Sequence, residues 1–71
     1  MITFNKDTQI YISQEPIDMR KAIDGLTGLV VHTLKENPQS GHVFIFHNKQ
    51  GNKVKALYWD RNGFVMHYNA S

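Results

Sequence analysis

The chain has 71 residues, contains no cysteine and carries a formal net charge of +2. A domain of this size buries only about 60% of the surface that its unfolded chain exposes, so its stability is marginal without additional support. The lack of cysteine excludes disulfide bonds and zinc sites built from thiolates, and no apolar run approaches the ~18 residues that a membrane span needs. We therefore expect a single small, soluble domain over residues 1–71, located in the cytoplasm.

The first elements in chain order are a short strand and a helix. The run Gln9–Ile12 is rich in β-branched and aromatic residues and predicts a strand. Asp18 can accept the free N–H groups of a first helical turn, and Asn37-Pro38 forbids continuation beyond Lys35. Between them, apolar residues recur every three or four positions, which is typical of an amphipathic helix. This apolar stripe consists of Met19, Ala22, Ile23, Leu26, Leu29, Val30 and Leu34.

Two glycines, Gly25 and Gly28, fall inside the predicted helix. Each costs about 1 kcal/mol of helix stability relative to alanine. A tight crossing with another backbone segment would explain both positions, and we favour this interpretation. The alternative is a kink or an early helix end near Gly28.

Three further strands are predicted after a turn at residues 39–41. They are His42–Asn48, Lys53–Trp59 and Phe64–Tyr68, and Asn62-Gly63 is a strong hairpin signal because both residues tolerate positive φ. Connections this short permit only antiparallel neighbours, so these strands form a meander. The expected fold class is α+β, with one amphipathic helix packed on an antiparallel sheet of three or four strands.

The strand register follows from the segregation of apolar residues. Loops of even length at Gln50-Gly51 and Asn62-Gly63 place most of the bulky apolar residues on one face of the sheet. This face contains Phe44, Phe46, Lys55, Leu57, Trp59, Phe64, Met66 and Tyr68. The opposite face contains Val43, Ile45, Val54, Ala56, Tyr58 and Val65.

The second face is also largely apolar, although one helix can cover only one face. An uncovered apolar face usually marks a surface that binds a partner, unless terminal residues such as Ile2 and Phe4 fold across it. Dimerisation, strand addition or docking onto a larger protein would each cover it. The predicted protein contacts are Val54, Ala56, Tyr58 and Val65.

The sequence offers little support for a metal site or an active site. His42 and His47 are five residues apart on one strand, so they point to opposite faces and cannot share an ion, and His32 stands alone on the helix. Asp18 and Asp60 have structural roles as a helix cap and a turn residue. No nucleophile triad, phosphate-binding loop or pair of catalytic acids is present. We expect a protein that is not an enzyme, without catalytic residues, metal or cofactor.

Nucleic-acid binding is a stronger candidate because the positive charge is unevenly distributed. Residues 42–71 have a net charge of +3, whereas residues 1–41 have −1. Cations beside aromatic residues are typical of proteins that hold phosphates while bases stack. An ordinary solvated surface with a lysine excess explains the same charges. The candidate DNA contacts are Arg20, Lys21, Lys53, Lys55 and Arg61.

Three blocks of the sequence, in the same order, resemble the transposition accessory proteins (TnpB-like, from the second open reading frame) of the Insertion Sequence 66 family. The blocks are Pro16–Leu26, Asn37–Phe46 and Lys55–Phe64. The resemblance implies a non-catalytic accessory protein of bacterial DNA transposition that binds the transposase, transposon DNA or both. The alternative is a structural module that forms a homodimer through its apolar sheet face and has no affinity for nucleic acid.

The chain departs from the family pattern in two places. Ala22 stands where relatives usually have glycine, which should strengthen the helix. Relatives also continue past the last strand with a basic segment, so we expect a member that is truncated at its C-terminus.

Overall fold

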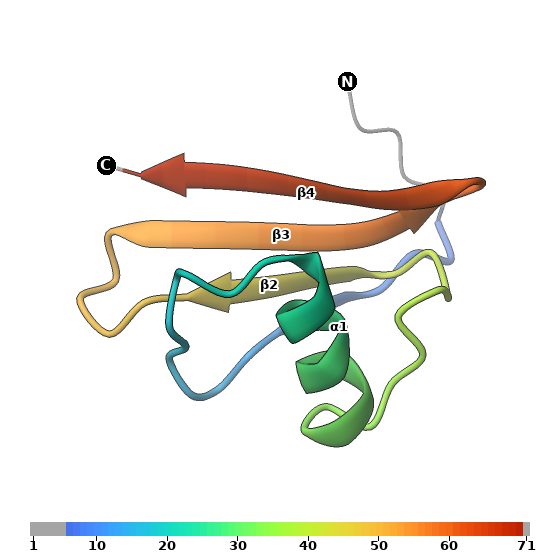
Figure 1. Cartoon of the computed structure of the whole chain (residues 1–71). Coiled ribbons are helices and arrows are strands. Elements are labelled where there is room, and N and C mark those ends of the chain that lie inside the picture. The colour runs from blue at the N-terminus through green and yellow to red at the C-terminus, as the bar shows by residue number, and fades with distance from the viewer. Residues whose placement is uncertain (1–5, 71) are drawn as a thin grey trace.

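The computed structural model describes residues 6–70, which form one helix and a four-stranded sheet (Figure 1). Ile2 and Phe4 lie outside the described residues. The elements in chain order are β1 (Ile10–Ile12), α1 (Ile23–His32), β2 (Val43–His47), β3 (Lys53–Asp60) and β4 (Gly63–Ala70). The strands lie in the order β1-β2-β3-β4, and α1 packs against one face of the sheet (Figure 1). The predicted α+β class is confirmed.

The first strand pairs differently from the other three. β1 is parallel to β2, with Ile10 opposite Val43 and Ile12 opposite Ile45, whereas the β2–β3 and β3–β4 pairs are antiparallel. The meander is therefore limited to β2–β4, and the prediction of a wholly antiparallel sheet is corrected at this edge. The physical reason is the long connection: the chain between β1 and β2 includes α1, which provides the crossover that parallel neighbours require.

The predicted division of the sheet into two faces is confirmed. Leu57 is opposite both Phe44 on β2 and Met66 on β4, so these three side chains share one face. The hairpin loop, however, lies one position earlier than predicted, because Asp60 pairs with Gly63. Arg61 adopts the left-handed conformation in this loop, with φ of 50°. A shift that keeps the loop even changes the pairing partners without exchanging the faces.

The start of α1 differs from the prediction. Helical structure begins at Ile23, after an extended Ala22 whose side chain makes no capping hydrogen bond. Asp18 instead closes a tight turn: its Oδ1 accepts the Arg20 N–H at 2.9 Å, and its carbonyl accepts the Lys21 N–H at 3.1 Å. The Asp18 carboxylate thus accepts a backbone N–H, as capping chemistry requires, but it stabilises a turn before the helix.

The glycines of α1 are not sites of close backbone packing. A methyl group at Gly28 would meet nothing within 4 Å, and one at Gly25 would meet only the Lys21 side chain at 3.3 Å. The helix also continues through both residues as far as His32. Neither the close-packing interpretation nor an early helix end at Gly28 is supported. Lys35, expected in the last turn, follows the helix in a left-handed conformation with φ of 58°.

The hydrophobic core lies between α1 and the face of the sheet that it covers. Its fully buried members are Leu26 and Val30 from the helix and Phe44, Phe46 and Leu57 from the sheet. Trp59 shares this face but is only partly buried, and it packs edge-to-face on Phe64 at 4.9 Å between ring centroids. Within residues 6–70, no helix is long and apolar enough to cross a membrane.

Candidate interaction surface

The face of the sheet opposite α1, called the open face below, brings the four predicted protein contacts together. Tyr58 pairs with Val65, and Ala56 pairs with His67 on the same two strands. Val54 is two residues from Ala56 along β3, so it projects to the same side. Paired residues of β1 and β2 extend this face to the other edge of the sheet. The open face contains Ile10, Ile12, Val43, Ile45, Val54, Ala56, Tyr58, Val65 and His67.

Several apolar side chains of the open face are accessible to solvent. Ile12 is 63% exposed, Ile10 57% and Val54 36%, while Val43 is buried. Ala56, Tyr58 and Val65 are half-buried. Ile10 and Ile12 lie on β1 and Val54 lies on β3, with β2 between these two strands. Each exposed β-branched residue leaves apolar surface in water, and a group of them on one face of a sheet is typical of an interaction surface.

Two aromatic rings give this face a polar margin near β4. Tyr58 and His67 stack with 6.0 Å between ring centroids and an interplanar angle of 17°. Each ring carries hydrogen-bonding atoms as well as an apolar surface, so the pair suits a protein interface that is apolar in its centre and polar at its edge.

Ile10 and Ile12 were missed as contact residues by sequence reasoning. The signal was present, since alternation within Gln9–Ile12 places both isoleucines on one side of a strand. What the sequence did not provide was the partner of that strand. The parallel pairing of β1 with β2 brings these residues onto the open face.

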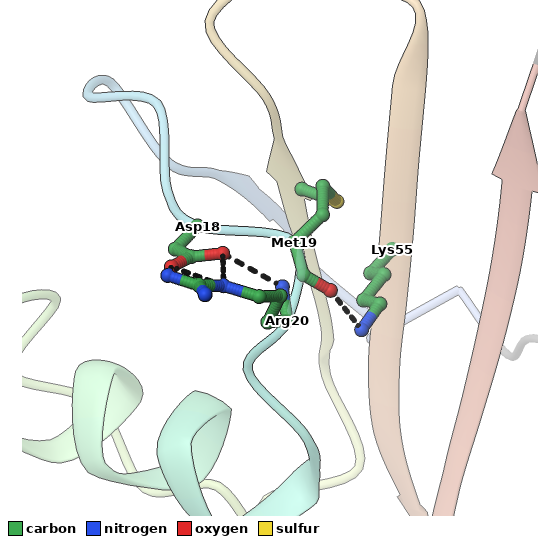
Figure 2. Close-up of polar contacts among 4 residues, drawn as sticks. All are labelled: Asp18, Met19, Arg20 and Lys55. Atoms are coloured by element: carbon green, nitrogen blue, oxygen red, sulfur yellow. Dashed lines mark hydrogen bonds and ion pairs between the residues drawn. The ribbon is translucent and has the colours of Figure 1, made fainter.

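Lys55, a predicted DNA contact, is buried beneath the segment that precedes α1. Its side chain lies on the covered face and is 8% exposed. Nζ donates a hydrogen bond to the carbonyl oxygen of Met19 at 2.7 Å (Figure 2) and another to the carbonyl oxygen of Lys21 at 2.8 Å. The ammonium also lies 5.7 Å from the centroid of the Tyr68 ring. The prediction that Lys55 contacts DNA is therefore corrected, because its charge is committed inside the fold.

The other four predicted DNA contacts are exposed but do not form one cluster. Lys53 and Arg61 lie at opposite ends of β3, roughly 25 Å apart at the usual rise of a strand. Arg20 and Lys21 lie on the loop before α1. The structure thus places no compact basic patch at the five predicted positions.

Arg20 is engaged in a bidentate ion pair with Asp18 (Figure 2). The Nη2–Oδ2 distance is 2.7 Å, and Arg20 Nε donates to both carboxylate oxygens. The hydrogen bonds from the Arg20 side chain, followed by that from its backbone, lower the pKa of Asp18 to about 2. The pKa of Arg20 is raised by the same side-chain contact. The Arg20 charge is largely neutralised by this pair.

His42 and His47 have structural contacts within the fold. His47 Nε2 donates to the Ser13 carbonyl at 2.9 Å, and His42 Nδ1 accepts the Gln9 N–H at 3.0 Å. The His47 contact connects β2 to Ser13, the residue after β1. The His42 contact connects the residue before β2 to Gln9, the residue before β1. Among residues 6–70, no group of three or more potential ligands is placed to hold a metal ion.

A comparison with known protein families gives a match over most of the chain. The family described as "IS66 Orf2 like protein" matches residues 8–70. The chain belongs to this family. The match includes all four strands and α1, and hence the whole of the open face described above.

Two curated relatives come from Sinorhizobium fredii (strain NBRC 101917 / NGR234). The uncharacterized protein y4jC is 30% identical over 66 residues, which cover 93% of this chain and 56% of the relative. The uncharacterized protein y4hO is 29% identical over 63 residues, which cover 89% of this chain and 55% of the relative. The chain thus spans about half the length of the curated relatives that it matches. No solved structure matches it.

Proposed function

We propose that the protein is a non-catalytic accessory factor of bacterial DNA transposition that acts in the cytoplasm and docks onto the transposase of its own element. Membership of the IS66 Orf2-like family supports the link to transposition. The observation that carries the docking step is the exposed apolar surface of the open face, above all Ile10 and Ile12.

Protein docking is favoured over a catalytic role by the chemistry of the described residues. Asp18, the most perturbed carboxylate, is paired with Arg20 on an exposed loop. A hollow that the described residues form is partly open to solvent, and it is lined by Asp7, Thr8, Ser40, Gly41 and His42. A reaction would require a water-excluding pocket with converging polar groups, whereas docking requires only a complementary apolar surface.

The test is a binding measurement between the purified chain and the purified transposase encoded beside it. Ile12→Glu and Val54→Glu each place a charge on the open face and should weaken binding at least about tenfold, because a buried charge without a partner is costly. Val31→Glu on α1 is the matched control, since Val31 is 44% exposed but lies on the helix. Binding that is unchanged by both open-face substitutions would overturn the proposal.

A duplex DNA probe distinguishes docking from the DNA-contact alternative. DNA binding would fall steeply with salt and would be weakened by Lys53→Ala and Arg61→Ala. Under our proposal, these substitutions leave transposase binding unchanged. Salt-dependent DNA binding by the chain alone, together with no affinity for the transposase, would favour direct DNA contact through Lys21, Lys53 and Arg61.

A further inference from the structure

The outer edge of β4 is a second feature with no role in the function proposed above. β4 pairs with β3 over its full eight residues, from Lys53↔Ala70 to Asp60↔Gly63, and this register contains no bulge. On its other side, no strand formed by residues 6–70 pairs with it, since β4 ends the sheet. Its outward backbone N–H and C=O groups therefore form a regular ladder that has no strand partner among the described residues.

This edge lacks the features that normally prevent strand association. Monomeric sheets protect an edge by keeping it short, by a bulge, by proline or by charged side chains, especially lysine. β4 is Gly-Phe-Val-Met-His-Tyr-Asn-Ala and contains no proline, lysine, arginine, aspartate or glutamate. The opposite edge is different, because β1 spans only three residues.

We propose that β4 pairs in antiparallel orientation with β4 of a second copy of the chain, forming a homodimer with a continuous eight-stranded sheet. A two-fold axis perpendicular to the sheet gives this orientation and preserves the faces. The two α1 helices then lie on one side, and the two open faces lie together on the other side.

The sequence of β4 favours a second copy as its partner. A face-preserving two-fold axis requires residues of the same face to meet, and with Met66 on the axis, Phe64 lies opposite Tyr68 of the second copy. Tyr68 is 52% exposed in the single chain, so it has surface to bury. Aromatic pairs across strands are stabilising. Because β4 contains no aspartate, glutamate, lysine or arginine, pairing two copies of β4 brings no like charges of these residues together. A charged peptide would gain less from this edge.

The pairing is independent of transposase docking. It uses the backbone edge of β4, whereas docking is tested at Ile12 on β1 and Val54 on β3, so different variants measure the two interactions. The dimer presents two open faces side by side, which would allow a dimeric or repeated partner to bind with higher avidity. Loss of one interaction therefore leaves the other measurable.

Sedimentation of the purified chain alone is the first test. A strand-edge interface is small, so we expect dimers with micromolar affinity, populated at about 100 µM chain. His67→Lys adds a charge at an exposed position of β4 and should weaken dimerisation at least about tenfold. His32→Lys makes the same substitution at an exposed position of α1 and should leave dimerisation unchanged. A monomer at this concentration would overturn the proposal, as would a dimer that is abolished by Ile12→Glu but not by His67→Lys.

Single-cysteine variants test the geometry, and the sequence has no cysteine to interfere. Only a residue on the two-fold axis faces its own copy, at a Cα separation of about 4.5–5.5 Å that suits a disulfide. Met66→Cys should therefore form a disulfide-linked dimer under mild oxidation, while Val31→Cys on α1 should not. Crosslinking at His67→Cys instead would also support β4 pairing, with the axis one residue further along. Absence of crosslinking at both β4 positions in folded variants would overturn it.

Discussion

At the scale of single residues, Lys55 connects two of the sequence blocks that carry the family resemblance. It lies in the block Lys55–Phe64, and its ammonium donates to the carbonyl oxygens of Met19 (Figure 2) and Lys21, which belong to the block Pro16–Leu26. A buried charge is tolerated only when it is well hydrogen-bonded, and here the acceptors come from the main chain. The segment before α1 is thus fixed by a side chain more than thirty residues away in sequence.

Substitution of Lys55 should destabilise the fold rather than reduce nucleic-acid binding. Lys55→Met keeps the length of the side chain but leaves two carbonyl oxygens without their donor, so we expect a loss of about 2 kcal/mol. Lys53 is exposed and lies two residues away on β3, so Lys53→Met should change the free energy of unfolding by less than about 0.5 kcal/mol. Urea unfolding followed by the fluorescence of the single tryptophan, Trp59, measures both. Equal stability of the two variants would contradict a role for Lys55 in holding the fold.

The Asp18–Arg20 pair should give stability a specific dependence on pH. The folded pKa of Asp18 is about 2 and its ordinary value is 3.8, so the folded state binds this proton less readily than the unfolded state. The contribution is therefore fully present above about pH 4 and is lost as the pH falls toward 2. Carboxyl NMR titration should give a midpoint near 2 for the native chain and one close to 3.8 for Arg20→Gln. A midpoint near 2 in both would mean that Arg20 is not the cause.

At the scale of elements, α1 shows where local sequence patterns were sufficient and where they failed. The apolar spacing correctly predicted the buried side of the helix, since Leu26 and Val30 are fully buried. The start was wrong because a local pattern cannot reveal the long-range hydrogen bonds from Lys55 that hold Met19 and Lys21 outside the helix. Met19, the first residue of the apolar stripe, lies in the loop before Ile23 and packs on the same core, whereas Ala22 is exposed.

The glycines within α1 offer a stability test at the scale of this element. Gly28→Ala should stabilise the protein by about 1 kcal/mol, because the position is helical and an added methyl group meets nothing within 4 Å. Gly25→Ala should gain less, since its methyl group would press on the Lys21 side chain at 3.3 Å. Thermal unfolding by circular dichroism compares the two. A loss of stability in Gly28→Ala would show that this position needs glycine for a reason other than packing.

At the scale of the whole molecule, the sheet was largely predictable because its face assignment depends only on alternation and on even loops. The loop between β3 and β4 moved by one position, yet Leu57 and Met66 still share the covered face. Alternation also places Lys55 on the covered face, so the strand register by itself argues against contact between Lys55 and DNA. Two features were beyond the sequence: the parallel pairing of β1, and the exposure of Ile10 and Ile12 that follows from it.

The two faces of the sheet should respond oppositely to substitution, and this decides whether the open face serves the fold or a partner. Ile12→Glu changes a side chain that is 63% exposed, so the stability of the isolated chain should change by less than about 0.5 kcal/mol. Leu57→Ala on the covered face removes a fully buried side chain and should cost about 2–5 kcal/mol. Urea unfolding at a concentration well below the micromolar Kd expected for the dimer, where the chain is monomeric, measures both.

A large loss of stability in Ile12→Glu would mean that the chain itself needs an apolar residue at this position. The open face would then be part of the fold, and the docking proposal would lose its basis. If stability is retained while transposase binding is lost, the apolar residue is required only in the complex. In that case, a partner that covers Ile10 and Ile12 would explain why these apolar residues are exposed in the isolated chain.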